Sequence, residues 1–138
     1  MKTTTDIKIF LVNSNLFYLN IYEQSFKKLG YNNVTIFLNG TDCINELVQK
    51  PDIIFMDDTL IDMSGSELLK QVKSLNPNIY VVLGIDPVEI KTAVNTLNYG
   101  VFDYIIKGED EMAKAEGILL RISKLRDIIK RKSLIFSF

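Results

Sequence analysis

Residues 51–58 have the sequence PDIIFMDD, an apolar run enclosed by a proline and by carboxylates. Four consecutive apolar residues, two of them β-branched, are typical of a strand that is buried on both faces of a sheet. We therefore expect residues 53–56 to form the central strand of the domain, with Asp57 at its carboxyl end. Such a strand places a polar side chain at the edge of the sheet, where chemistry can occur.

The rest of the chain alternates between apolar runs and segments with helical spacing. The other expected strands are residues 7–12, 34–38, 79–85 and 101–106. The expected helices are residues 16–29, 41–48, 66–75, 87–99 and 109–132. Alternation of strands and helices with short connections indicates a three-layer α/β domain with a parallel sheet and right-handed crossovers.

Length and composition fit one compact domain and exclude several kinds of site. We interpret residues 1–138 as a single domain, in which an extended C-terminal helix and an apolar tail begin at about residue 109. The chain contains no histidine, which excludes a His-ligated zinc and a Ser-His-Asp triad. Cys43 is the only cysteine, so an internal disulfide cannot form, and we expect this thiol to pack in the core.

Charge and hydropathy give no sign of a nucleic-acid or membrane partner. The formal net charge is −1, so no strong field attracts an anionic polymer or an anionic membrane. No apolar run approaches the roughly 18 residues that a membrane span needs. We expect a cytoplasmic protein that contacts neither nucleic acid nor a membrane directly.

The chain carries distinctive residues where four of the predicted strands end. In an open parallel sheet the carboxyl ends of the strands meet at one edge, and ligands bind in the crevice there. The residues that this topology brings to the edge are Asn13, Ser14, Asp57, Asp58, Gly84, Ile85 and Lys107. Strand alternation turns Asp58 away from the side that Asp57 faces, unless the backbone bends.

Two blocks of sequence at these strand ends resemble the receiver domain of two-component response regulators. The first is PDIIFMD at residues 51–57, with Gly65 eight positions after Asp57. The second is GVFDYIIK at residues 100–107. The resemblance extends over about residues 7–125 and implies a doubly wound, flavodoxin-like receiver fold with a five-stranded sheet in the order 2-1-3-4-5.

The resemblance also implies roles for three residues. Asp57 corresponds to the phospho-acceptor, Lys107 to the phosphate-pairing lysine, and Tyr104 to the aromatic residue that reports the conformational switch. The residues themselves leave a second interpretation open, in which Asp57 and Lys107 form a permanent ion pair that closes the crevice. Such a pair would hold one conformation where a receiver switches between two.

The sequence departs from the family where a divalent metal is expected. Receivers have two acidic residues after the first strand, which help to hold Mg²⁺, whereas this chain has Asn13 and Ser14. Losing two negative charges weakens cation binding by on the order of 1 kcal/mol each. We therefore expect at most a weak, degenerate Mg²⁺ site, formed by Asn13, Ser14, Asp57 and Thr59.

The end of the fourth strand lacks a hydroxyl group that the family uses. Receivers have a threonine or serine there, whose hydroxyl binds the phosphoryl oxygen and moves with it. Counting back from Gly100 without gaps puts Ile85 at this position, and a shift of one residue gives Gly84. Neither side chain can donate a hydrogen bond to a phosphoryl group.

These departures leave three interpretations of function. The first is a divergent receiver that acts in phosphorelay signalling through protein contacts, with weakened or lost phosphorylation. The second is an active receiver that is phosphorylated on Asp57. The third is a small flavin or nucleotide binder on the same fold, although bulky residues at 16–18 replace the expected phosphate loop. Enzymatic turnover is not expected, because no second general base accompanies Asp57 and Lys107.

The C-terminal end of the sequence points to protein partners. Its predicted helix carries basic residues around an apolar stripe formed by Ile118, Ile122, Leu125 and Ile129. The tail LIFSF at residues 134–138 has four large apolar side chains, which seldom stay exposed, so it either covers a partner or belongs to a longer protein. We expect a protein partner such as a sensor kinase or an output domain, and a homodimer through the last helix and tail as a further assembly.

Overall fold

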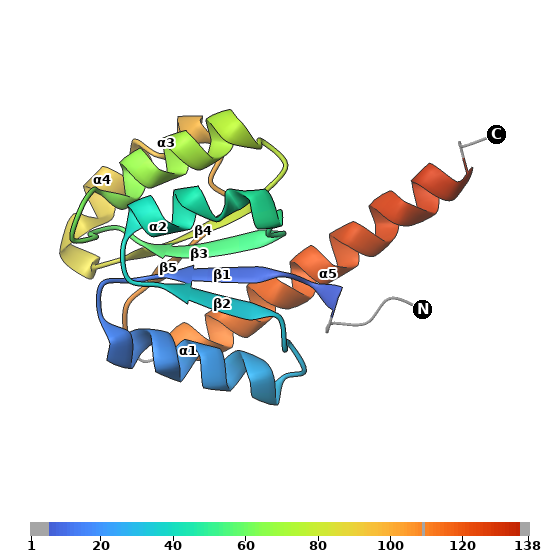
Figure 1. Cartoon of the computed structure of the whole chain (residues 1–138), viewed down its shortest axis with the longest axis horizontal. Coiled ribbons are helices and arrows are strands. Elements are labelled where there is room, and N and C mark those ends of the chain that lie inside the picture. Colours follow the sequence, from blue (N-terminus) through green and yellow to red (C-terminus); the bar gives the residue numbers. More distant parts are fainter. Residues whose placement is uncertain (1–5, 109, 136–138) are drawn as a thin grey trace.

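The computed structural model of the protein describes residues 6–108 and 110–135, and its centre is a five-stranded parallel sheet. The strands are β1 Ile9–Val12, β2 Val34–Phe37, β3 Ile53–Asp57, β4 Tyr80–Ile85 and β5 Asp103–Ile106. Their order is β2-β1-β3-β4-β5 and neighbouring strands are parallel, which confirms the predicted topology. The predicted central strand, β3, lies in the middle of this sheet (Figure 1).

Within the described part of the chain, five α-helices cover the two faces of the sheet. They are α1 Leu16–Lys28, α2 Gly40–Asn45, α3 Gly65–Leu75, α4 Ile90–Val94 and α5 Glu111–Ile135. Helices α1 and α5 lie on one face, and α2, α3 and α4 lie on the other, which confirms the predicted three layers (Figure 1). Short 3₁₀ helices occur at Leu47–Gln49, Pro87–Glu89 and Leu97–Tyr99.

The sheet is buried on both faces because its strands alternate apolar side chains between two core clusters. Strand β3 sends Ile54 and Met56 toward α2 and α3, and Ile53 and Phe55 toward α1 and α5. All of its residues are buried, as the continuous apolar run predicts. Cys43 is buried in the first of these clusters, as expected. Each buried apolar side chain contributes about 2 kcal/mol, so this core firmly fixes the strand ends.

Two helices are shorter than the sequence pattern predicts. The helix expected over residues 41–48 stops at Asn45, and the 3₁₀ turn after it ends at Lys50, whose left-handed backbone (φ 57°) prevents further helix. The helix expected over residues 87–99 is reduced to α4, because 3₁₀ helices flank it on both sides. Ala93 is the buried apolar residue of α4, and the larger apolar side chains beside it are exposed.

Helix α5 extends well beyond the sheet. Figure 1 shows its C-terminal half projecting away from the body of the domain. Ile118 and Ile122 are buried, whereas Leu125 and Ile129 are 38% and 57% exposed, so only the first half of the predicted stripe belongs to the core. The predicted tail lies partly outside the described residues, which end at position 135. None of the described helices is long and apolar enough to cross a membrane.

Gly65 begins α3 directly behind the backbone at the end of β3. A methyl group at this position would lie 2.7 Å from Asp58 Cα and 2.8 Å from Leu83 Cδ1, and it would also overlap the Asp57 carbonyl oxygen. We predict that Gly65→Ala lowers the free energy of unfolding by about 2 kcal/mol, because backbone atoms cannot move aside without displacing Asp57. Urea denaturation measures this change.

Gly117→Ala is the matched control for this substitution. Gly117 is exposed on α5, and an added methyl group would meet nothing within 4 Å. Alanine favours a helix over glycine by ~1 kcal/mol, so this variant should be slightly more stable than the unmodified protein. Equal stability of Gly65→Ala and the unmodified protein would contradict the close packing of α3 against β3.

Candidate functional site

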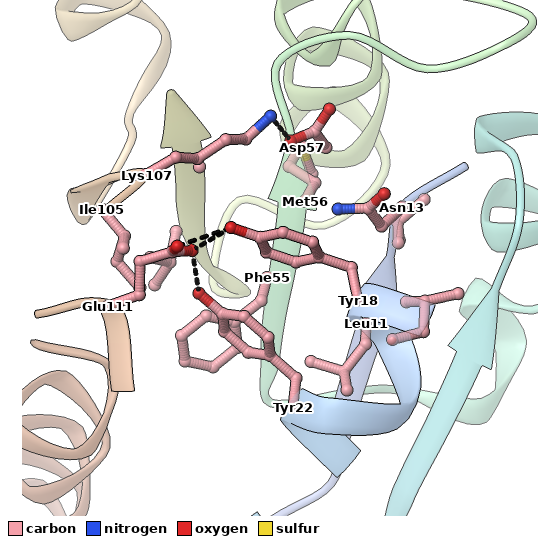
Figure 2. Close-up of a pocket in the computed structure, with 14 residues that line it drawn as sticks. Leu11, Asn13, Tyr18, Tyr22, Phe55, Met56, Asp57, Ile105, Lys107 and Glu111 are labelled. Atoms are coloured by element: carbon pink, nitrogen blue, oxygen red, sulfur yellow. Dashed lines mark hydrogen bonds and ion pairs between the residues drawn. The ribbon is translucent and has the colours of Figure 1, made fainter. Parts of the chain in front are cut away.

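The ends of four strands meet at one small pocket at the carboxyl edge of the sheet. At this edge the pocket is lined by Asn13 after β1, Asp57 in β3, Gly84 in β4 and Lys107 after β5 (Figure 2). Its volume is about 40 Å³, which holds a few water molecules at most. The sheet topology therefore brings the predicted acceptor and the predicted lysine together.

Asp57 is the most buried ionisable group of this pocket, with 8% of the residue exposed. The Lys107 ammonium forms an ion pair with Asp57 Oδ1, and the Thr59 N–H donates a hydrogen bond of 3.3 Å to Asp57 Oδ2. The backbone of Lys107 continues the pairing of β5, because its N–H donates to Ile85 O at 2.9 Å. Both members of the ion pair are therefore held by the sheet.

Asp58 also lies near the lysine. Lys107 Nζ is 3.6 Å from Asp58 Oδ1. Regular strand alternation would send this side chain away, but β3 ends at Asp57 and the backbone then turns, with Asp58 O accepting from the Gly65 N–H at 2.8 Å. One ammonium therefore serves two carboxylates, and the bend of the backbone at Asp58 is the condition under which the sequence allowed this approach.

The charges of this group shift one another's pKa. Burial raises the pKa of the Asp57 carboxyl above its usual value, and the Lys107 ammonium offsets this effect only in part. Burial alone would lower the pKa of Lys107, but the Asp57 and Asp58 carboxylates raise it instead. The ionised Asp57 carboxylate therefore destabilises the fold, and the charged lysine reduces this cost.

The residues predicted to bind a metal are engaged in other contacts. Asn13 Oδ1 accepts from the Asn15 N–H at 2.9 Å, and Ser14 Oγ accepts from the Ile61 N–H at 2.8 Å. Thr59 is exposed and does not line the pocket. Among the described residues, no group of three or more Asp, Glu, His or Cys side chains is placed to hold a metal ion. The residues present fit Mg²⁺ poorly, because this ion binds through free carboxylates and both carboxylates here face the lysine.

Gly84, rather than Ile85, is the residue of β4 that faces the acceptor. Gly84 pairs with Asp57 in the sheet register, and a Cβ atom on Gly84 would lie 3.9 Å from Asp57 Oδ1. Ile85 is buried in the core cluster on the α2 and α3 side. The residue of β4 that faces Asp57 therefore has no side chain, although there is room for one.

Tyr104 is bound to the α4 region through a residue that the sequence did not single out. Its hydroxyl lies 2.8 Å from Ala93 O and 2.7 Å from Thr96 Oγ1. Thr96 is buried, and its hydroxyl donates to Ala93 O at 2.7 Å. The Tyr104 ring packs against the core on this side of the sheet. These contacts hold the tyrosine in place, and its role as a switch stays a prediction.

A second polar cluster lies on the α1 side of the pocket (Figure 2). Glu111, at the start of α5, accepts hydrogen bonds from the hydroxyls of Tyr18 and Tyr22, and all three residues line the pocket. In the sequence, Tyr18 stood out only as one of the bulky residues at positions 16–18, and Tyr22 and Glu111 were assigned no role. The available signal was the spacing of four residues, which puts both phenols on one side of a helix.

Replacing the lysine tests the charge balance of the site. We predict that Lys107→Ala lowers the free energy of unfolding by about 1–3 kcal/mol at neutral pH, because it leaves two largely buried carboxylates side by side. The loss should shrink as the pH falls. In this variant the pKa of Asp57 in the folded protein lies above its value in the unfolded chain. As the pH falls through the range between these two pKa values, Asp57 is protonated and the repulsion between the carboxylates is relieved. Urea denaturation at about pH 7 and about pH 5 gives both values.

The control for this prediction is Lys107→Ala combined with Asp57→Asn. This double variant removes one buried negative charge together with the lysine, so it should recover most of the lost stability. A Lys107→Ala protein that is as stable as the unmodified protein would show that the ion pair contributes nothing to the fold.

Comparison with known proteins identifies relatives over most of the chain. The sequence model of the family described as response regulator receiver domain matches residues 9–116. Transcriptional regulatory protein ZraR of Salmonella typhimurium is 30% identical over 105 residues, which cover 75% of this chain and 24% of that protein. A protein-glutamate methylesterase/protein-glutamine glutaminase of Clostridium acetobutylicum is 36% identical over 104 residues, which cover 72% and 28%. The chain thus spans about a quarter of the length of these curated relatives.

Solved structures agree with the fold. A response regulator receiver domain protein from Clostridium thermocellum has a TM-score of 0.75 at 19% identity, covering 94% of this chain and 99% of that chain. A CheY-like receiver domain protein from Methanospirillum hungatei JF-1 has a TM-score of 0.77 at 22% identity, covering 88% and 97%. The family match over residues 9–116, on a sheet of this topology, shows that the chain belongs to the response regulator receiver domain family of two-component signalling.

Proposed function

We propose that this chain is a divergent receiver domain that signals through protein contacts and takes up a phosphoryl group on Asp57 weakly or not at all. The composition of the site around the ion pair carries this proposal, because Lys107 and Asp57 meet in a site with little else to support a reaction. Asn13 and Ser14 bring no charge, and Gly84 brings no side chain. A site of this composition favours one charge state and one conformation.

The charge balance gives the physical reason for weak phosphorylation. Transfer of a phosphoryl group to a carboxylate needs cations and hydrogen-bond donors for the incoming oxygens. Here Lys107 offers one cation, and the Thr59 N–H offers one donor near Asp57 Oδ2. Phosphorylation replaces the single charge of the Asp57 carboxylate with about two phosphoryl charges, so it adds about one negative charge to a site that already has more carboxylates than ammonium groups. Without a tightly held metal, this extra charge makes the phosphorylated state unfavourable.

An active receiver is the second candidate, and the retained geometry favours it. Asp57 and Lys107 face each other at the strand ends where the family places its acceptor and its lysine. In that case Asn13, Ser14, Asp57 and Thr59 would hold Mg²⁺ weakly, mainly through uncharged oxygens. A flavin or nucleotide binder lacks support, because a pocket of about 40 Å³ is far smaller than such a ligand requires.

A phosphodonor assay separates the two candidates. Intact-mass analysis after incubation with a small phosphodonor and Mg²⁺ detects a phosphoryl adduct of about 80 Da. We predict little or no adduct on the unmodified chain. The combination Asn13→Asp, Ser14→Asp and Gly84→Ser should show a clear gain, because it restores charge for the metal and a hydroxyl beside the acceptor.

Asp57→Asn, added to the same triple variant, is the control and should abolish the adduct. Abundant adduct on the unmodified chain, removed by Asp57→Asn alone, would contradict weakened phosphorylation and favour the active receiver.

The partners proposed for this domain are proteins. One relative is a transcriptional regulatory protein, and the match covers 24% of its length. We therefore propose a sensor kinase or an output domain as the partner of this domain. We propose no enzymatic turnover in this chain. Basic residues of α5 are used within the domain: Arg121 pairs with Asp103, and Arg126 lies 3.5 Å from Asp52. Direct contact with nucleic acid is therefore not part of the proposal.

We further propose that the projecting part of α5 binds a second copy of this chain. Leu125, Ile128 and Ile129 are exposed there. We predict a dimer at about micromolar concentration that becomes a monomer in Leu125→Ser with Ile129→Ser, because these changes remove apolar contact area. Light scattering reports the mass. Leu75→Ser, at an exposed leucine on α3, is the control and should leave the dimer intact. A monomeric unmodified chain would exclude this assembly.

A further inference from the structure

Glu111 is a carboxylate that lines the same pocket as the ion pair of the site without taking part in it. It follows Lys107 by four residues and lines the same pocket as Lys107 and Asp57 (Figure 2). Within the described residues, the Lys107 ammonium pairs with Asp57 and Asp58. Lysine is a point charge on a flexible stem, so an unsatisfied carboxylate close to it competes for its ammonium.

Both oxygens of the Glu111 carboxylate instead accept hydrogen bonds from uncharged donors. The Tyr18 hydroxyl lies 2.6 Å from Oε1 and 2.5 Å from Oε2, and the Tyr22 hydroxyl donates to Oε1 at 3.1 Å. The Gly108 N–H, in the turn after Lys107, donates to Oε2 at 3.0 Å. The two tyrosine rings stack on α1 with their centroids 5.8 Å apart, so they reach the carboxylate as a unit.

Phenols suit this task because they donate hydrogen bonds without adding positive charge. Burial and the nearby Glu111 carboxylate raise the pKa of both Tyr18 and Tyr22 above the usual value, so both stay protonated donors at neutral pH. A lysine or arginine at either position would also bind Glu111, but its charge would repel the Lys107 ammonium. The tyrosines therefore satisfy Glu111 and leave the ion pair undisturbed.

We propose that Tyr18 and Tyr22 are positioning residues for Lys107. By occupying the carboxylate of Glu111, they remove a competitor for the ammonium, which stays on Asp57. The consequence for phosphoryl transfer rests on the function proposed above, whereas the location of the ammonium does not.

The test compares a double variant with a triple variant. Tyr18→Phe with Tyr22→Phe removes both hydroxyls and keeps both rings. The freed Glu111 then draws the ammonium away from Asp57, and the pKa of Asp57 should rise by about one unit. Adding Glu111→Gln removes the competing charge, so the pKa of Asp57 should return to its value in the unmodified protein. Carbon-13 NMR titration of the aspartate carboxyl groups, without any phosphodonor, measures all three proteins.

A purely structural role for the cluster predicts a different result. In that case the triple variant would be disturbed at least as much as the double variant, because it has lost one more group of the cluster. An unchanged Asp57 pKa in the double variant, or a raised pKa that persists in the triple variant, would overturn the proposal. Tyr18→Phe alone, which removes the shorter hydrogen bonds, serves the same comparison where the double variant is too unstable to titrate. Since no phosphodonor is present, the outcome does not depend on phosphorylation of Asp57.

Discussion

One ammonium between two carboxylates holds the functional edge of this domain together. Asp57 and Asp58 stand at the end of the most central strand, where ionised carboxylates lose much of their hydration. Lys107 offsets this cost, because the pairing of β5 with β4 carries its backbone to the same edge. Strand β4 lies between β3 and β5, and a Cβ atom on Gly84 would lie 3.9 Å from Asp57 Oδ1, so this strand leaves room beside the acceptor.

The groups around this ion pair favour one arrangement of the loops. The side-chain oxygens of Asn13 and Ser14 accept backbone hydrogen bonds from neighbouring loops. The carboxylate of Asp62, in the loop after β3, accepts from the N–H groups of Gly40 and Thr41 at 2.9 Å each. Oxygens that would face a cation in the family's metal site are thus engaged in the loop framework here. The same two residues, Asn13 and Ser14, therefore tether the loops and, in the function proposed above, bring no charge to a metal ion.

The sheet and the contact at its edge could be predicted because both follow from short-range patterns. Apolar runs buried on two faces require a parallel sheet, and a parallel sheet brings Asp57 and Lys107 to one edge. The rest depends on single backbone turns and on long-range contacts. Asp58 turns toward the lysine because β3 ends one residue before it. Tyr18 meets Glu111 across 93 positions of sequence, and no local pattern links two such residues.

Hydrogen bonds join the turn that follows Lys107 to α1 and α5. Lys107 is joined through the turn that follows it to Glu111, which binds Tyr18 on α1. On the opposite side, Gly84 has no side chain that could reach toward Tyr104, whose hydroxyl bonds within the α4 region. In the part of the chain that is described, polar contacts therefore join the turn after Lys107 to α1 and α5, whereas no side chain at Gly84 connects the acceptor with Tyr104. Because a packed core resists small displacements, the polar contacts are the ones that a single charge can alter directly.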